Sequence, residues 1–210
     1  MIEQSSLRNA ESLIRFGAEK LSSISNVPRL EAEVLLSNLL KINPIKFHTD
    51  DIGISSNVMD KFESMIESRF KGMPIAYLIG KKEFWSLEFE INPSVLVPRP
   101  ETELLIENAI ELLKDHESPR ILELGTGSGI ISIVLYRELV TPEITATDIS
   151  DEALYVAKNN ADRYQIKDIN FLVSDWFSEI QNKKYDLIIS CLLYTSPSPR
   201  DQRGSRMRSS

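Results

Sequence analysis

The chain has 210 residues, 42% of them hydrophobic and 26% charged, so it can bury a core and hold one large domain or two smaller ones. No run approaches the roughly 18 apolar residues that a membrane span needs, and the acid-bearing N-terminal segment lacks the apolar core of a secretion signal, so we expect a cytoplasmic protein without membrane contact. The net charge is −7, and because the last 20 residues hold four arginines and one aspartate, residues 1–190 carry −10. This acidic body argues against a general nucleic-acid binder, which normally shows a basic stripe.

Helical periodicity dominates the first part of the chain, to about residue 72. One helix is indicated by apolar residues that recur on a single face: Leu7, Ala10, Ile14, Ala18 and Leu21. A second helix is predicted to begin near Pro28, because proline suits the first turn; its apolar stripe is flanked by Leu30, Val34 and Leu40. A third is indicated by Met59, Phe62, Ile66 and Phe70. We predict a small all-α domain over residues 1–80.

The next segment changes from helical to alternating periodicity. The stretch EFWSLEFEIN (residues 83–92) alternates and is aromatic, which predicts a strand or hairpin. We assign residues 81–95 to a β-hairpin that links two domains. A proline-containing extended segment then leads into an amphipathic helix. The residues of this helix that we expect to face inward are Leu105, Ala109 and Leu112.

Strands and helices alternate in the rest of the chain, up to residue 190. Buried strands are indicated at residues 120–124, 143–148, 169–176 and 185–190, with helical segments after the first two. This alternation predicts a parallel, doubly wound sheet. The predicted fold class is therefore α/β, with a Rossmann-like domain over residues 96–190 that follows the helical bundle and the hairpin.

The most informative motif is LELGTGSG, residues 122–129, directly after one predicted strand and directly before a helix. Glycines in this context let the backbone approach a ligand closely, and the helix start offers free N–H groups. Ile130 stands where the third glycine of the dinucleotide-binding pattern would fall, so the motif departs from that pattern. Glu123 fits a ligand with an ammonium group better than one with a pyrophosphate. The candidate cofactor-binding residues are Gly125, Thr126, Gly127, Ser128 and Gly129.

Two further candidates follow the next two predicted strands. Asp148 ends the second strand, where a carboxylate can accept hydrogen bonds from both ribose hydroxyls of an adenosine; the alternative is a residue that serves only the start of the next helix. Trp176 follows Asp175 at the end of the third strand, where it either stacks against adenine or packs in the core. The combination suggests S-adenosylmethionine, whose methyl transfer depends on alignment and electrostatics rather than on covalent catalysis.

Several motifs, in this order and spacing, resemble the glutamine N5-methyltransferases that modify peptide chain release factors. They are PIAYLIGKKEFWSLEF, VLVPRPETELL, ILELGTGSG, TDIS, SDWF and YDLIIS, and the resemblance covers residues 1–190. It implies a helical N-terminal domain that helps to hold the release factor, a linking hairpin and a methyltransferase domain with S-adenosylmethionine as cofactor. The sequence gives Arg99, Pro100 and Thr102 of the PRPETE motif no individual role.

The resemblance also implies that YDLIIS continues as Asn-Pro-Pro-Tyr, which recognises the target glutamine. The chain instead continues with Cys191, Leu192 and Leu193, followed by a basic segment rich in Ser, Pro and Arg. We therefore expect a chain cut short before its catalytic motif and hence inactive, with a non-native tail over residues 191–210. The alternative is a disordered interaction tail, which this composition also permits.

Other functions stay open at this point. A nicotinamide-dependent oxidoreductase fits the layout of strand, glycines, helix and aspartate, but not the glycine spacing. A ribosomal-protein glutamine methyltransferase, an adenine-N6 methyltransferase and a non-catalytic protein that binds release factors are further alternatives. Neither His48 nor His116 has a second His or Cys nearby, so we predict no metal site. We expect a monomer that binds a protein substrate and no nucleic acid.

Overall fold

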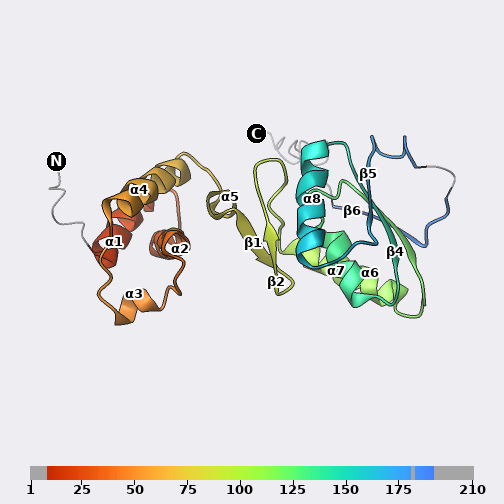
Figure 1. The fold of residues 1–210 in the computed structure, drawn as a ribbon, viewed down its shortest axis with the longest axis horizontal. Helices are drawn as coiled ribbons and strands as arrows, with labels where there is room; N and C mark the ends of the chain where they lie inside the picture. The colour runs from red at the N-terminus through yellow and green to blue at the C-terminus, as the bar shows by residue number, and fades with distance from the viewer. Residues whose placement is uncertain (1–8, 181–182, 192–210) are drawn as a thin grey trace, which may run out of the picture. The chain divides into compact units, whose positions relative to one another are not determined.

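The computed structural model describes residues 9–180 and 183–191, and the chain divides into two compact units (Figure 1). The helical unit comprises Met1–Lys82 and Ile91–Pro93, and the α/β unit comprises Glu83–Glu90 and Ser94–Ser210. Within the described residues, no helix is long and apolar enough to cross a membrane.

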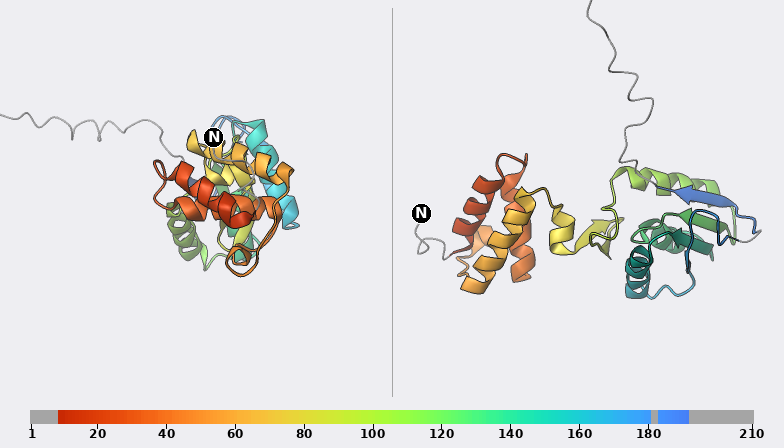
Figure 2. Two further views of the ribbon diagram at one scale, coloured as in Figure 1. Left: turned by 90° about the vertical axis from the view of Figure 1, so that its left-hand side faces the viewer. Right: turned by 90° about the horizontal axis from the view of Figure 1, so that it is seen from above.

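The helical unit holds the predicted helices and two short ones. Its elements are α1 (Ala10–Leu21), α2 (Pro28–Leu40), α3 (Lys46–Thr49), α4 (Ser56–Phe70) and α5 (Ile75–Ile79). In the views of Figure 2, α1, α2 and α4 lie against one another. Periodicity did not predict α3 and α5, because helices of four and five residues are too short to show a repeat.

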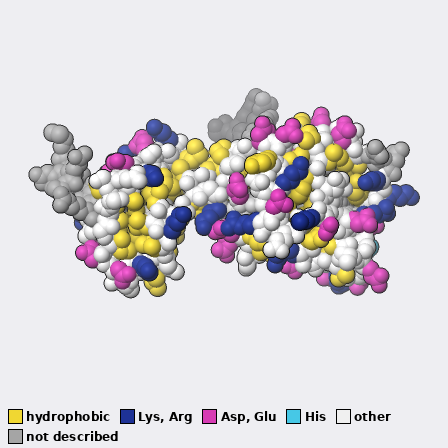
Figure 3. All heavy atoms as spheres, viewed as in Figure 1, with side chains coloured by type: hydrophobic (Ala, Val, Ile, Leu, Met, Phe, Trp, Pro, Cys, Tyr) yellow, Lys and Arg dark blue, Asp and Glu magenta, His cyan; other side chains and the backbone are white. Residues whose placement is uncertain are grey.

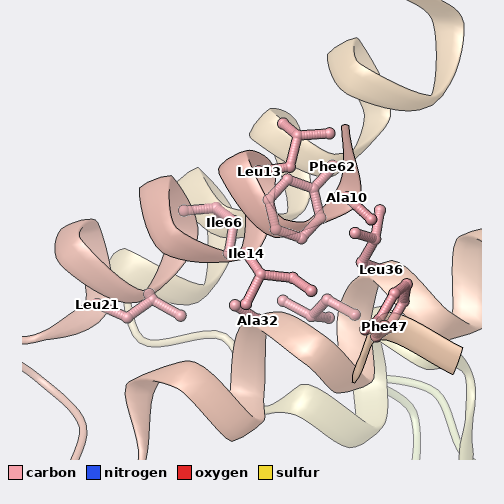
Figure 4. Close-up of a cluster of buried hydrophobic side chains, with 10 residues drawn as sticks. Ala10, Leu13, Ile14, Leu21, Ala32, Leu36, Phe47, Phe62 and Ile66 are labelled. Atoms are coloured by element: carbon pink, nitrogen blue, oxygen red, sulfur yellow. The ribbon is translucent and has the colours of Figure 1, made fainter. Parts of the chain in front are cut away.

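The core of the helical unit is formed by apolar side chains from α1, α2 and α4, together with Phe47 of α3 (Figure 4). Leu13 and Ile14 of α1 lie with Phe62 of α4 in this cluster, and all three are fully buried. Gly17 permits the close approach: a Cβ at this position would lie 2.9 Å from side-chain atoms of both Ile66 and Phe62. Gly17 is therefore buried on the inner face of α1, whereas Ala18, which we predicted to lie on this face, is only half-buried.

Between the two helical regions of the chain, β1 (Lys81–Phe84) pairs with β2 (Leu87–Glu90) in the predicted hairpin. Its two turn residues, Trp85 and Ser86, have φ angles of 52° and 56°. Positive φ at both central residues is typical of the type I′ turn, whose twist matches that of the two strands. The turn places Trp85 at the tip, while the neighbouring Phe84 is buried.

The α/β unit confirms the predicted parallel sheet and α/β class. Its strands β3 (Arg120–Leu124), β4 (Glu143–Asp148), β5 (Asn170–Val173) and β6 (Leu187–Ser190) lie in the order β5-β4-β3-β6, all parallel. The helices are α6 (Glu101–Leu113), α7 (Ile130–Glu138) and α8 (Asp151–Arg163). Helix α7 contacts both α6 and α8, and both α7 and α8 contact β4.

The predicted inner face of α6 is partly wrong. Leu112 is 68% exposed, and Leu113 is buried in its place, together with Ile106 and Ala109. The segment LLIENAIELL contains two overlapping apolar rows one residue apart. Only the packing partner decides which of the two rows turns inward, and the structure shows that partner to include α7.

Candidate active site

Parallel pairing aligns the carboxyl ends of the strands of the α/β unit at one edge of the sheet. Leu124 at the end of β3 is in register with Thr147 of β4 and Ser190 of β6, and Asp148 is in register with Val173 of β5. The segments that follow these strands therefore begin side by side. Since β4 and β6 flank β3, this is the point where the strand order reverses, and open α/β sheets bind ligands there.

The loop between β3 and α7 holds three glycines in left-handed backbone conformations, with φ of 73° at Gly125, 56° at Gly127 and 79° at Gly129. The amides of Gly125 and Thr126 both donate to the carbonyl of Thr147, at 2.9 and 2.8 Å. A Cβ at Gly129 would lie 3.0 Å from the Cβ of Ala157 in α8, whereas one at Gly127 would meet nothing within 4 Å. Gly129 therefore serves packing, and Gly127 faces open space.

Asp148 joins this loop to the start of α8. Its Oδ2 accepts from the amide of Gly127 at 2.9 Å, and its Oδ1 accepts from the amide of Ser150 at 3.0 Å. Ser150 in turn caps α8 by accepting from the amide of Ala153 at 3.1 Å. Asp148 thus supports the start of α8, which is the alternative role that the sequence left open for it. Its carboxylate also lines a cavity.

This cavity has a volume of about 410 Å³ and lies at the carboxyl edge of the sheet. We call it the larger hollow, because a smaller cavity adjoins it. Gly125, Gly127, Asp148 and Trp176 all line it, so the structure brings these predicted residues together. Trp176 is 56% exposed with φ of 51°, a conformation supported by the bond from the Ser174 hydroxyl to its carbonyl at 2.9 Å. The indole is therefore presented to the hollow rather than packed in the core.

Sequence reasoning missed other parts of the larger hollow. Ile149, directly after Asp148, is 70% exposed and lines it, as do Val95 and Leu96 from the segment before α6. An apolar residue at the exposed start of a helix was a usable signal for Ile149. No local pattern marked Val95 and Leu96, because they come from a segment about 30 residues away from the glycine loop.

Glu123, one residue before the end of β3, carries a buried carboxyl group that is only 2% exposed. Its Oε2 accepts from the hydroxyl of Thr126 at 2.8 Å, from the amide of Ser132 at 3.1 Å and from the Ser132 hydroxyl. Burial raises the pKa of Glu123 to about 7, although the hydrogen bonds from Ser132 and Thr126 act in the opposite direction. The carboxyl therefore fixes the glycine loop to α7 and titrates near neutral pH.

Glu123 also lines a second cavity, the smaller hollow, with a volume of about 70 Å³. Thr126 and Ser128 of the glycine loop line it from one side, and Arg99 and Thr102 of the PRPETE motif from another. Leu96, Gly125, Gly127 and Cys191 line both hollows, so the two cavities adjoin. The PRPETE motif, which the sequence left without a role, thus contributes to this site.

Cys191 follows β6 at the position where the resemblance places an asparagine. Its Sγ lies 3.4 Å from the Thr102 hydroxyl, and it lines both hollows. The rest of the predicted non-native tail, residues 192–210, lies outside the described residues.

Asn160 of α8 ties the loop to the hairpin, and sequence reasoning did not single it out. This fully buried side chain donates to the carbonyls of Ser128 and Glu90, at 2.9 and 3.1 Å, and accepts from the Glu90 amide at 2.7 Å. An asparagine at the inward position of an amphipathic helix was the available signal, because a buried amide needs partners.

Trp85, at the tip of the hairpin, lines neither hollow. The indole N–H of Trp85 donates to Glu138 at 3.0 Å, and Trp85 lines a separate cavity with Phe84, Glu83 and Glu103. Among residues 9–180 and 183–191 there is no group of three His, Cys, Asp or Glu side chains that could hold a metal ion.

Comparison with known proteins adds family information to this geometry. Residues 12–80 match the family described as PrmC N-terminal domain, and residues 115–202 match the family described as Methyltransferase domain. A release factor glutamine methyltransferase of Coxiella burnetii is 39% identical over 173 residues, which cover 82% of this chain and 62% of that protein. The corresponding protein of Shewanella oneidensis is 35% identical over 191 residues (90% and 65%), and that of Buchnera aphidicola subsp. Schizaphis graminum 42% over 174 residues (82% and 62%). The chain thus spans less than two thirds of the length of these relatives.

Proposed function

The chain belongs to the release factor glutamine methyltransferase family, and on this premise we propose that the complete protein transfers a methyl group from S-adenosylmethionine to the side-chain amide nitrogen (N5) of a glutamine in a peptide chain release factor. The observation that carries the proposal is the larger hollow, where three strand ends bring Gly127, Asp148 and Trp176 to one cavity. A carboxylate, an aromatic face and a glycine loop are the groups that an adenosine ligand needs at this edge of a sheet.

The residues of both hollows fit S-adenosylmethionine. Gly127 leaves open space next to the backbone, Asp148 offers carboxylate oxygens for the ribose hydroxyls, and Trp176 offers an apolar face for adenine. Glu123, in the wall of the smaller hollow, offers a carboxylate for the ammonium group. We propose as the cofactor-binding set Gly125, Thr126, Gly127, Ser128, Gly129, Asp148 and Trp176, with Gly129 acting through its packing on Ala157.

The reaction explains why the site is built for alignment. Bound S-adenosylmethionine supplies an electrophilic methyl carbon on its sulfonium. The lone pair of a glutamine amide nitrogen is delocalised into the carbonyl, so the residues around the substrate must accept its N–H bonds and hold it in line. At position 191, where the family places an asparagine, this chain has Cys191, whose thiol is a weak donor and a weak acceptor. We therefore propose that this 210-residue chain binds the cofactor without methylating its substrate.

We also propose a role for each part of the chain. Residues 1–80 form the domain that holds the release factor, residues 81–95 the linker and residues 96–190 the methyltransferase domain, followed by a non-native tail from residue 191. Acidic side chains lie among the basic ones on the face shown in Figure 3, which supports a protein substrate rather than nucleic acid. A release factor acts in translation, so we place the protein, as a monomer, in the cytoplasm.

The test compares the 210-residue chain with a full-length relative, such as that of Coxiella burnetii, as positive control. Calorimetry is expected to show that the chain binds S-adenosylhomocysteine and not NADH. Mass spectrometry of a release factor incubated with S-adenosylmethionine is expected to show methylated glutamine with the relative and none with the chain. Binding of NADH alone would contradict the methyltransferase assignment, and methylation by the chain would contradict its proposed inactivity.

A second function, non-catalytic binding of release factor, is favoured by Cys191 at the asparagine position. A pull-down with release factor distinguishes it: retention together with absent methyl transfer supports a binding protein. Loss of retention in a chain that still binds cofactor would exclude this second function and leave the cofactor site untouched.

A further inference from the structure

The smaller hollow differs from the larger one in the charged groups that line it. Among its lining residues, Arg99 and Glu123 carry the charged side chains, one basic and one acidic. The larger hollow instead is lined by the carboxylates of Asp148 and Asp175 and by apolar residues. Because the two cavities share part of their wall, they form one site. Its larger hollow suits a nucleoside, and its smaller hollow is lined by one positive and one negative side chain.

Arg99 is held at this position by its neighbours in the chain. Pro98 and Pro100 restrict the backbone on either side, and the carbonyl of Arg99 accepts from the amide of Thr102 at 3.0 Å, which begins the first turn of α6. The guanidinium makes no hydrogen bond or ion pair within the part of the chain that the structure describes. An exposed arginine that lines a cavity without a partner has its donors available for a ligand.

Glu123 lines the same cavity, and one of its carboxyl oxygens, Oε1, accepts no hydrogen bond from the described residues. Among the described residues, three hydrogen bonds reach its carboxyl group, and all three go to Oε2, from Thr126 and Ser132. The buried group therefore keeps Oε1 for another donor. Free acceptors on Glu123 and free donors on Arg99 are the complement of a zwitterion, which carries an ammonium and a carboxylate on adjacent atoms. The amino-acid end of S-adenosylmethionine is such a group.

We infer that Arg99 binds the carboxylate of the amino-acid end of S-adenosylmethionine, and that it thereby distinguishes the complete cofactor from nucleosides that lack this carboxylate. The planar guanidinium matches a carboxylate with two parallel hydrogen bonds, which lysine does not reproduce. The start of α7, represented in this cavity by Ile130 and Ile131, adds the positive end of a helix dipole. This inference rests on the proposed function, because it names a contact within the same cofactor site.

The experiment uses two ligands that differ only in this carboxylate, S-adenosylmethionine and decarboxylated S-adenosylmethionine. Their dissociation constants are measured by calorimetry for the 210-residue chain and for Arg99→Ala, Arg99→Lys and Arg120→Ala. Arg120 is the matched control, since it is exposed at the opposite, amino end of β3 and lines neither hollow. We expect Arg99→Ala to weaken S-adenosylmethionine about tenfold, as the loss of a charge-assisted hydrogen-bond pair at a solvent-accessible site predicts.

The pattern across ligands decides the outcome. Arg99→Ala is expected to leave the affinity for the decarboxylated ligand unchanged, Arg99→Lys to recover part of the loss, and Arg120→Ala to change neither affinity. Equal weakening of both ligands in Arg99→Ala, or weakening of neither, would overturn the role of Arg99 while the cofactor site itself stands. If the unsubstituted chain bound neither ligand, the proposed function would fail, and the contact with it.

Discussion

Buried polar side chains are distributed unequally between the helical unit and the α/β unit. Among the described residues, the helical unit buries two, Glu33 and Ser37. The α/β unit buries nine: Thr102, Glu123, Thr126, Ser128, Ser132, Thr145, Thr147, Asn160 and Ser174. Most of these hydrogen-bond within or next to the glycine loop. The helical unit is therefore held by apolar packing, whereas the α/β unit also depends on a polar network that shapes its ligand site.

The strongest test of this contrast removes apolar packing from the helical unit. Phe62→Ala takes a fully buried ring from the cluster of α1, α2 and α4 and is expected to lower the free energy of unfolding of this unit by about 3 to 5 kcal/mol. Native-state hydrogen exchange of amides in α1 and α4 measures the change.

Phe70→Ala is the matched control, because Phe70 lies on the same helix but is exposed. Both tryptophans of the chain, Trp85 and Trp176, belong to the α/β unit, so their fluorescence reports on that unit alone. A loss of tryptophan-detected stability as large as the loss in α1 would contradict the picture of two separate cores.

The second test addresses the polar network through pH. Burial raises the pKa of Glu123 to about 7, so the folded protein holds this proton more tightly than the unfolded chain, in which the pKa is near 4.5. The stabilising effect of protonation is complete below pH 4.5 and is lost as the pH rises through 7. Relative to Glu123→Gln, the unsubstituted chain should lose up to about 3 kcal/mol between pH 4.5 and pH 8.

Urea unfolding followed by tryptophan fluorescence at several pH values measures this difference. Glu179→Gln serves as control, because Glu179 is an exposed carboxyl group in the same unit. A constant difference between the unsubstituted chain and Glu123→Gln from pH 4.5 to 8 would show that Glu123 keeps one protonation state.

The same contrast explains how much of the molecule the sequence predicts. Apolar periodicity locates α1, α2 and α4, because each of them turns an apolar face to a common core. In detail it is less reliable: Leu30 of α2 and Phe70 of α4 are exposed, and in α6, where two apolar rows compete, Leu112 is exposed as well. The choice between the rows is made by a packing partner that a local pattern does not contain.

The candidate site is predictable where it follows strand ends. Gly127, Asp148 and Trp176 each lie at the end of a recognisable strand or within three residues after it, and parallel pairing brings such positions to one edge. Leu96 and Arg99 reach the site from a segment before α6, and the buried Asn160 reaches it from α8. Tertiary structure alone brings these residues to the loop, so no spacing rule in the sequence identifies them.

A smaller effect is expected at the exposed wall of the site. Trp176→Ala removes the aromatic face from the larger hollow and is expected to weaken S-adenosylhomocysteine about tenfold. Phe177→Ala is the matched control, because Phe177 is 51% exposed next to it and does not line the hollow. Calorimetry compares the two variants. Equal affinities of the two variants for S-adenosylhomocysteine would mean that adenine does not contact the indole. Trp176 would then have no role in binding the cofactor.

The smallest effect is expected where the helical unit does use charge. Arg69 donates through two nitrogens to the two carboxylate oxygens of Glu31, at 2.8 and 3.0 Å, and this hydrogen bonding lowers the pKa of Glu31 below 4.5. A lowered pKa means that the stabilisation is present above pH 4.5 and is lost as the pH falls through the folded-state pKa. Arg69→Ala should therefore lower the free energy of unfolding of the helical unit by about 1 kcal/mol at pH 7, and by progressively less in acid. Hydrogen exchange of amides in α2 and α4 measures the change at pH 7, and urea unfolding followed by circular dichroism measures it below pH 5. Lys71→Ala, which removes a longer, more exposed pair with Glu67 at 3.6 Å, should change nothing measurable; an equal cost for both variants would show that net charge, rather than this pair, stabilises the helices.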